Sequence, residues 1–184
     1  EKQFKKQGMT ILTSSEVTKV DTSGNGVKAT IKSAAGEQVI EADILLSAVG
    51  VVANIENIGL EQLGIKTEKG KIVVDANQQT NVAGVYAIGD CTPGQALAHV
   101  ASKEGINAAE HLAGLKITPM DYNNIPGCTY CTPEIASVGF TEKAAKDAGY
   151  EIKVGKFPFM ASGKASAAGA TEGFVKVIYD AKYG

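Results

Sequence analysis

The stretch TNVAGVYAIGDCTPGQALAHVASKEG (residues 80–105) decides the fold, because it joins an apolar run to a helical pattern through a glycine-rich turn. The run up to Gly89 predicts a strand over residues 84–89. After Gly94, apolar residues recur three and four positions apart, which predicts a helix over residues 96–112. Strand, loop and helix in this order are typical of a sheet that binds a ligand beyond the carboxyl ends of its strands.

Asp90 lies at such a strand end, and its chemistry suits a ligand that carries hydroxyl groups. A carboxylate accepts hydrogen bonds from sugar-like hydroxyls, and Gly89 lets a ligand approach the backbone. The helix start after Gly94 has no charged residue, so its unpaired N–H groups and its dipole are free to stabilise electron density on a ligand. A Gly-Asp pair after a strand is also compatible with an ordinary turn, and the pattern alone leaves both interpretations open.

The rest of the chain predicts a mixed α/β (α+β) fold without internal repeats. Short strand-like runs with turn residues between them predict a β-meander over residues 9–42, with a hairpin turn at residues 23–26. The continuous apolar run of residues 43–50 predicts a strand that is covered on both faces. Further elements are expected as a short helix over residues 58–64, a helix over residues 142–148 capped by Thr141, a loop over residues 161–173, and strands over residues 72–74, 136–140, 152–159 and 174–180.

Composition excludes several classes of protein. The chain has 184 residues, 44% of them apolar, and a net charge of -2 with acids and bases interspersed, so it is a globular sequence without the basic stripe that nucleic acids require. Its apolar runs are too short to span a membrane, and no secretory signal is visible. Neither end resembles a natural terminus, so we expect a piece of a longer polypeptide. The low number of cysteines, three in the whole chain, favours a reducing compartment such as a bacterial-type cytoplasm.

Several motifs resemble the pyridine-nucleotide–disulfide oxidoreductases, a family of flavoproteins with two dinucleotide-binding domains. The family's second flavin motif, T-x₃-G-[apolar]-[apolar]-A-x-G-D, is matched at Thr80, Gly84, Val85, Tyr86, Ala87, Gly89 and Asp90. The segments ALAHVASKEG, DYNNIPGCTYCTPEIASVGFTEKAAKDAG and VGKFPF are similar to the family as well, in the same order. The resemblance covers essentially the whole chain and is strongest to the members that oxidise dihydrolipoamide.

The resemblance implies three regions and a set of cofactor contacts. Residues 1–50 would be the carboxyl-terminal part of an NAD-binding domain, residues 51–118 the central region that completes the FAD site, and residues 119–184 the first part of a dimerisation domain. Asp90 would bind the ribityl chain of FAD, beside Gly89. The main chain at the helix start would meet the pyrimidine edge of the flavin, and two positions would contact NAD. These residues are Ala96, Leu97, Ala98 and His99 for FAD, and Gly50 and Val17 for NAD.

The implied activity passes electrons from protein-bound dihydrolipoamide through a redox disulfide and FAD to NAD. The expected partners are a second copy of the chain, in a homodimer, and a lipoyl-bearing acyltransferase or carrier protein of a 2-oxoacid dehydrogenase or glycine cleavage system. The C-x₄-C pair, the two G-x-G-x-x-G loops and the His-Glu pair of the family do not occur here. We therefore expect no catalytic residue in this chain and no dehydrogenase activity from the chain alone.

Three alternatives stay open at this stage. The chain could come from a glutathione- or mercuric-reductase-like enzyme, or it could be a non-catalytic dimerisation module. The CTYC segment could also be part of a metal site at Cys128 and Cys131. That segment lies between prolines in chain that reads as extended, where residues three apart point to opposite faces, so we expect reduced cysteines and no metal.

Overall fold

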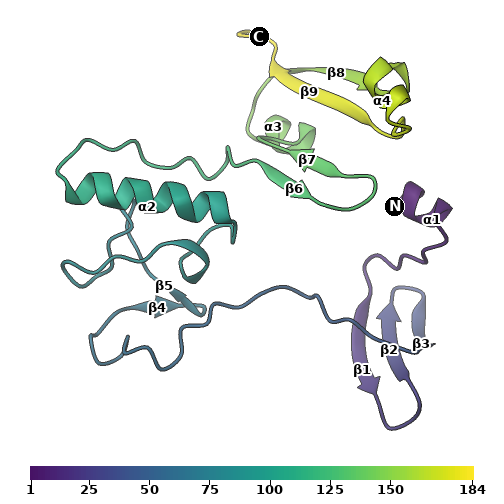
Figure 1. The fold of residues 1–184 in the computed structure, drawn as a ribbon, viewed down its shortest axis with the longest axis horizontal. Coiled ribbons are helices and arrows are strands. Elements are labelled where there is room, and N and C mark those ends of the chain that lie inside the picture. Colours follow the sequence, from purple (N-terminus) through teal and green to yellow (C-terminus); the bar gives the residue numbers. More distant parts are fainter. The chain divides into compact units, whose positions relative to one another are not determined.

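The structure is a computed structural model that describes all of residues 1–184. The chain forms two compact units, Glu1–Val51 and Val52–Gly184. The helices and strands of each unit are labelled in Figure 1. No helix is both long and apolar enough to span a membrane.

The first unit consists of a short helix and an antiparallel sheet in the strand order β1-β2-β3. Its elements are α1 (Lys2–Lys6), β1 (Glu16–Asp21), β2 (Val27–Ser33) and β3 (Gly36–Ala42). The predicted meander over residues 16–42 is thus confirmed, whereas residues 9–13 form no strand. Gly26 closes the first hairpin with a φ of +111°, and a Cβ at this position would lie 2.7 Å from the carbonyl oxygen of Ala42, so only glycine fits.

The prediction of a strand over residues 43–50 was wrong. This segment pairs with none of the strands and is extended chain (Figure 1). Three of its apolar side chains are almost fully exposed, at 84% for Ile44, 87% for Leu46 and 97% for Val49. A continuous apolar run becomes a central strand only when neighbouring strands supply hydrogen bonds and covering layers bury both faces. The structure contains neither beside this segment.

The second unit begins with a small core built around a hairpin. The strands β4 (Thr67–Glu68) and β5 (Lys71–Ile72) pair antiparallel, and Leu60, Ile65 and Ile72 form the buried cluster. Residues 58–64 make turns instead of the predicted helix, because Gly59 and Gly64 both have positive φ and confine the segment to about one turn.

The segment that begins at Thr80 forms a β-bridge, a turn and a long helix. The prediction of a strand over residues 84–89 was wrong, since Tyr86 makes only an isolated antiparallel bridge with Gln79. The chain then passes through the 3-10 helix η1 (Gly89–Cys91) into α2 (Ala98–Leu112), which confirms the predicted helix with a start two residues later. Figure 1 shows α2 beside the segment that leads out of β5, and η1 packs against α2.

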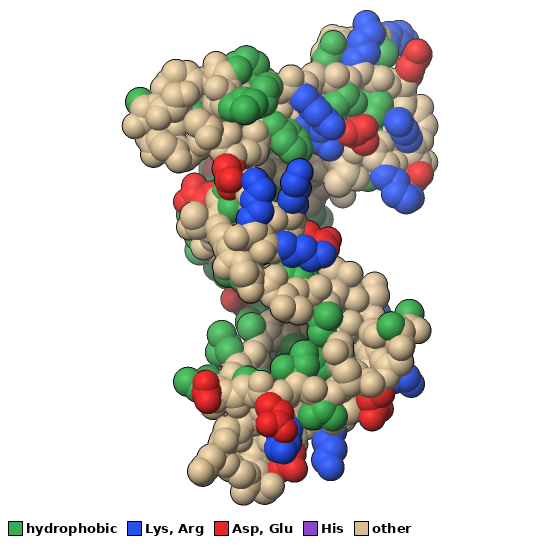
Figure 2. Space-filling model, turned by 90° about the vertical axis from the view of Figure 1, so that its right-hand side faces the viewer, with side chains coloured by type: hydrophobic (Ala, Val, Ile, Leu, Met, Phe, Trp, Pro, Cys, Tyr) green, Lys and Arg blue, Asp and Glu red, His purple; other side chains and the backbone are tan.

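The last part of the second unit contains two antiparallel strand pairs and three short helical segments. Both pairings, β6 with β7 and β8 with β9, are antiparallel. The elements are β6 (Gly127–Thr129), β7 (Ile135–Ser137), α3 (Glu142–Asp147), β8 (Ile152–Pro158), η2 (Phe159–Ala161), α4 (Gly163–Ala167) and β9 (Phe174–Asp180). The strands predicted over residues 152–159 and 174–180 are confirmed, the strand predicted over residues 136–140 is confirmed only up to Ser137, and η2 and α4 occupy part of the segment predicted as a loop. Many apolar side chains reach the surface (Figure 2).

The N-cap of α3 can be tested by substitution of Thr141. The Thr141 hydroxyl accepts a hydrogen bond from the Ala144 N–H at 3.1 Å, as the sequence predicts for an N-cap. We expect Thr141→Ala to destabilise the helix by about 1 kcal/mol, which raises amide hydrogen exchange of α3 about fivefold. The control, Thr141→Ser, keeps the hydroxyl and should exchange like the wild type. Equal exchange in the alanine variant would contradict the assigned cap.

Candidate functional site

The turn before Gly89 is closed by the side chain of Thr80. Its hydroxyl donates to the carbonyl of Val85 at 3.0 Å and accepts from the N–H of Val82 at 3.2 Å. The Thr80 N–H also donates to the Val85 carbonyl, at 2.9 Å. Gly84, with a φ of +79°, allows the chain to reverse between these partners. Thr80 and Gly84 therefore shape the loop that leads to Asp90.

Gly89 fastens the next turn to helix α2. Its N–H donates to Oε2 of Glu104 at 2.7 Å, and its φ is +76°. A Cβ at Gly89 would lie 3.2 Å from the Cβ of Ala101, so the backbone approaches α2 closely at this point. The hydroxyl of buried Thr92 donates to the Gly89 carbonyl at 2.8 Å and closes η1. Asp90 thus follows a residue that is held through both its N–H and its C=O.

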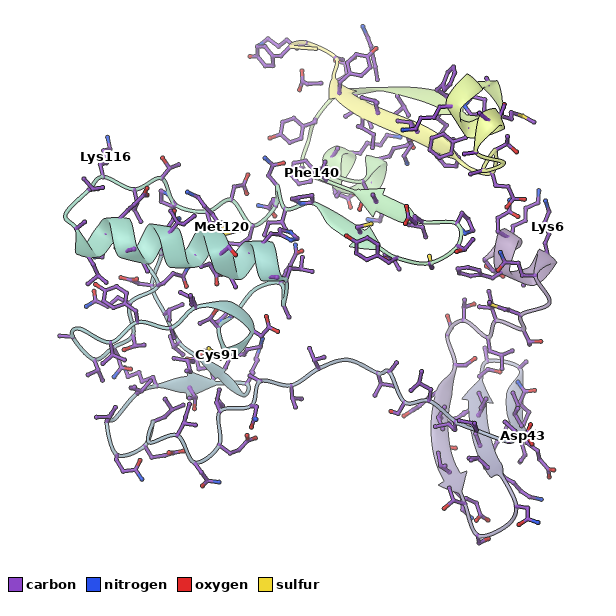
Figure 3. The ribbon with its side chains drawn as sticks, viewed as in Figure 1. Lys6, Asp43, Cys91, Lys116, Met120 and Phe140 are labelled. Carbon is purple, nitrogen blue, oxygen red and sulfur yellow. The ribbon has the colours of Figure 1, made fainter.

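The side chain of Asp90 is exposed and makes no hydrogen bond or ion pair in the structure. Its backbone carbonyl, in contrast, accepts from Nζ of Lys71 at 2.6 Å. The neighbouring Cys91, labelled in Figure 3, packs against the cluster of Leu60, Ile65 and Ile72. The loop is therefore anchored through its backbone and neighbours, while a carboxylate with free acceptor capacity is left for another molecule.

The amino end of α2 also has free hydrogen-bonding capacity. Leu97 is the N-cap residue without a side-chain cap, and the first turn contains no acid. The Leu97 carbonyl accepts from the N–H groups of Val100 and Ala101, whereas the N–H groups of Ala98 and His99 have no acceptor. Such amides, together with the positive end of the helix dipole, stabilise negative charge on a ligand.

The His99 ring is engaged in a structural contact. Its Nε2 lies 3.0 Å from the carbonyl oxygen of Pro126, so a hydrogen bond here requires the ring proton on Nε2. This contact joins the first turn of α2 to the segment that enters β6. The backbone of His99 thus lies at the amino end of α2, and its ring joins the helix to the segment that follows it.

The two residues expected to contact NAD belong to the first unit. Val17 lies on β1, beside an irregularity in the pairing with β2, and is 54% exposed. Gly50 has a φ of +119°, and a Cβ built on it meets no atom within 4 Å. Both are open to a ligand within their own unit, and their assignment to NAD stays a prediction.

A partly buried hydrogen-bond network at the site was missed by the sequence interpretation. Glu104 is only 1% exposed, and its Oε1 accepts from the Tyr122 hydroxyl at 2.6 Å. The Tyr122 oxygen in turn accepts from Nε2 of Gln78 at 3.2 Å. Burial, followed by the hydrogen bond to Glu104, raises the pKa of Tyr122 above its usual value. The signal was present, because Glu104 is four residues from both Val100 and Ala108 and so shares the apolar face of the helix.

The CTYC segment is extended only in its first half, because Cys128 and Thr129 belong to β6, whereas Cys131 lies in the bend that leads to β7 and its N–H donates to the Thr129 carbonyl at 3.0 Å. Cys128 is exposed on β6, and the thiol of Cys131 donates to the Pro133 carbonyl at 3.1 Å. All three cysteines are free, and the structure groups no three His, Cys, Asp or Glu side chains that could hold a metal ion. The geometry gives the metal-module alternative no ligand set.

Comparison with known families finds two matches along the chain. Residues 1–105 match the model of the pyridine nucleotide-disulphide oxidoreductases, and residues 125–184 match the dimerisation domain of the same family.

Individual relatives agree with these matches. The dihydrolipoyl dehydrogenase of Rhizobium etli is 50% identical over the whole chain, which spans 38% of that relative. The solved structure of LpdA from Mycobacterium tuberculosis has a TM-score of 0.87 at 28% identity, covering 98% of this chain and 39% of that one. RclA from Escherichia coli, an HOCl-induced flavoprotein disulfide reductase, has a TM-score of 0.87 at 26% identity, covering 98% and 41%. The chain thus spans about two fifths of the proteins that it resembles.

Replacement of Gly89 tests the close approach to α2. We expect Gly89→Ala to lower stability by about 1–3 kcal/mol, because alanine is strained at this positive φ and its methyl group crowds Ala101. Thermal unfolding measures the loss. Gly163→Ala is the matched control, since its added methyl group meets nothing within 4 Å. A Gly89→Ala variant that melts with the wild type would show that the turn is not tightly constrained.

The raised pKa of Tyr122 predicts a pH dependence. The folded protein holds the phenol proton more tightly than the unfolded chain, so this contribution to stability is complete below the unfolded pKa of about 10 and is lost as pH rises through the folded pKa. We expect the melting temperature of the wild type to fall more steeply above about pH 10 than that of Tyr122→Phe, which cannot ionise. Melting curves from pH 8 to 11 measure this, and parallel slopes would contradict it.

Proposed function

We propose that this chain, which belongs to the pyridine nucleotide-disulphide oxidoreductase family, is a segment of an FAD-dependent dihydrolipoyl dehydrogenase. The complete protein would oxidise protein-bound dihydrolipoamide and pass the electrons through a redox disulfide and FAD to NAD. The identity of 50% to a dihydrolipoyl dehydrogenase over the whole chain supports this substrate class.

One observation carries the proposal: an unpaired carboxylate and unpaired helix amides lie on one short segment. Asp90 offers acceptor oxygens, and the N–H groups of Ala98 and His99 offer donors at the positive end of α2. FAD presents the complementary groups, ribityl hydroxyls and the carbonyl and nitrogen atoms of a pyrimidine ring. The residues therefore fit FAD.

Each residue of the site has a defined task in this proposal. Asp90 would bind the ribityl hydroxyls, and Gly89 would keep the adjacent backbone free of a side chain. The main chain at Ala96, Leu97, Ala98 and His99 would orient the flavin ring by its pyrimidine edge. When bound, FAD would supply the redox chemistry between the dithiol and the nicotinamide.

NAD and the partner proteins belong to the complete enzyme. Val17 and Gly50 would border NAD within the first unit. The dimerisation-domain match of residues 125–184 supports a homodimer. On the hairpin β8–β9, Phe157, Phe174 and Val177 are about half exposed and suit burial against another subunit. A lipoyl-bearing acyltransferase or carrier protein would deliver the substrate. The free cysteines suit a reducing compartment, for which we propose the cytoplasm.

A second candidate is another FAD-dependent disulfide reductase. The structural similarity to RclA favours it, because that protein is named as a flavoprotein disulfide reductase. The flavin site would be the same in both cases, and the substrate tells them apart. Purified full-length protein should be yellow and reduce NAD with dihydrolipoamide. A yellow, FAD-containing protein that does not oxidise dihydrolipoamide would favour the second candidate. A colourless protein, without FAD, would overturn both.

Asp90 provides the residue-level test. We expect Asp90→Ala to weaken FAD binding by the full-length protein about 10- to 100-fold, the value of a hydrogen bond to a charged group. Titration of the flavin-free protein with FAD, followed by flavin fluorescence, measures the affinity. Asp121→Asn is the control, because that exposed side chain accepts only from the N–H of Asn123, a role that asparagine can keep. Unchanged affinity in Asp90→Ala would remove this residue from the site.

A further inference from the structure

We propose that Glu104 and Tyr122 act as a latch that holds the turn of residues 89–94 in the shape that receives the flavin. The latch is the hydrogen-bonded side-chain pair Glu104–Tyr122 together with the N–H of Gly89. It rests on the proposed function, since the turn carries Asp90 and leads into the amino end of α2. Both residues are positioning residues, because they act on the ligand through the turn.

The carboxylate of Glu104 is divided between two donors from different segments. Oε2 accepts from the Gly89 N–H at 2.7 Å and Oε1 from the Tyr122 hydroxyl at 2.6 Å. Gly89 immediately precedes Asp90, whereas Tyr122 comes from the segment between α2 and β6. One side chain of the helix therefore fixes the start of the cofactor turn and the connecting segment together.

The Tyr122 ring holds the other end of the same turn. A Cβ built on Gly94 would lie 3.1 Å from Cε1 of Tyr122, so the ring packs directly on the Gly94 backbone. The Tyr122 oxygen also accepts from Nε2 of Gln78, which belongs to the loop before the turn. The latch thus contacts the turn at both ends, through Glu104 at Gly89 and through the tyrosine ring at Gly94.

The burial of Glu104 shows why this arrangement implies a holding role. A carboxylate that is 1% exposed loses its hydration, and only good hydrogen bonds offset that loss. An apolar side chain between Val100 and Ala108 would fill the helix face without this requirement. The acid adds two directional, charge-assisted hydrogen bonds, which fix the turn more strictly than packing does.

Hydrogen exchange and FAD titration of the full-length protein test the latch with conservative variants. Tyr122→Phe removes one hydroxyl and leaves the ring on Gly94. Glu104→Ala removes both acceptors, and Glu104→Gln restores an acceptor for Gly89. Tyr150→Phe is the matched control, because the Tyr150 hydroxyl makes no hydrogen bond and its ring contact with Phe140 is retained. Val100→Ala is a second control, since it removes buried packing from the same helix face and keeps every hydrogen-bonding group of the latch.

The latch predicts effects with and without flavin. In the flavin-free protein, Tyr122→Phe should raise amide exchange of residues 88–95 about tenfold, and the FAD dissociation constant should rise by about the same factor. Glu104→Gln should lie between the wild type and Glu104→Ala, because its amide oxygen can still accept from the Gly89 N–H while its NH₂ group cannot accept from the Tyr122 hydroxyl. Tyr150→Phe should match the wild type, and Val100→Ala should lower the melting temperature without a selective rise in exchange of residues 88–95.

Three results would overturn the latch, and they differ from failure of the proposed function. Unchanged exchange of residues 88–95 in Tyr122→Phe would show that the pair does not hold the turn. Faster exchange with unchanged FAD affinity would show that it holds the turn without serving the flavin. An equal loss of FAD affinity in Val100→Ala would show that the Glu104–Tyr122 pair affects binding only through the general stability of the protein. Failure of the proposed function is read from the wild type alone, as a protein that binds no FAD.

Discussion

The hydrogen bond from the Gly89 N–H to the buried carboxylate of Glu104 is the constraint on which the site depends. It joins a residue with positive φ to the second turn of a long helix, and it sets the point from which Asp90 extends. Nζ of Lys71 donates to the Asp90 carbonyl, so the backbone is held at this residue as well and the acidic side chain remains free. The exposed carboxylate and the unpaired amides of α2 are consequences of this anchoring.

The site combines two kinds of sequence information. The path of the loop is specified by Thr80, Gly84 and Gly89. The Thr80 hydroxyl closes the turn with a hydrogen bond, and the positive φ values of the two glycines leave few other backbone conformations. Asp90 and the uncapped start of α2 contribute little to that path, and they carry the capacity for binding. A motif that unites both kinds of residue in a fixed order identifies a family more reliably than either part alone.

Local signals in the sequence predicted those elements whose partners lie nearby in the chain. The helix α2 and the cap at Thr141 depend on neighbours within a few residues, and the meander of β1 to β3 pairs strands that follow one another directly through turns marked by glycine, so these elements were predicted well. Residues 43–50 and 84–89 have the composition of strands, but a strand forms only where a second strand supplies hydrogen bonds. The latch was missed because a charged residue on an apolar helix face becomes informative only once Tyr122, 18 residues away, is placed beside it.

The exposed segment of residues 44–52 has a consequence for handling the chain. Five of its side chains, Ile44, Leu46, Val49, Val51 and Val52, are at least 80% exposed, and its backbone pairs with no strand. An apolar, uncharged and extended stretch of this kind is a template for intermolecular β-pairing. Concentrated solutions of this polypeptide by itself are therefore prone to aggregation that starts at this segment, and a charged substitution within it would be the first means of keeping the material soluble.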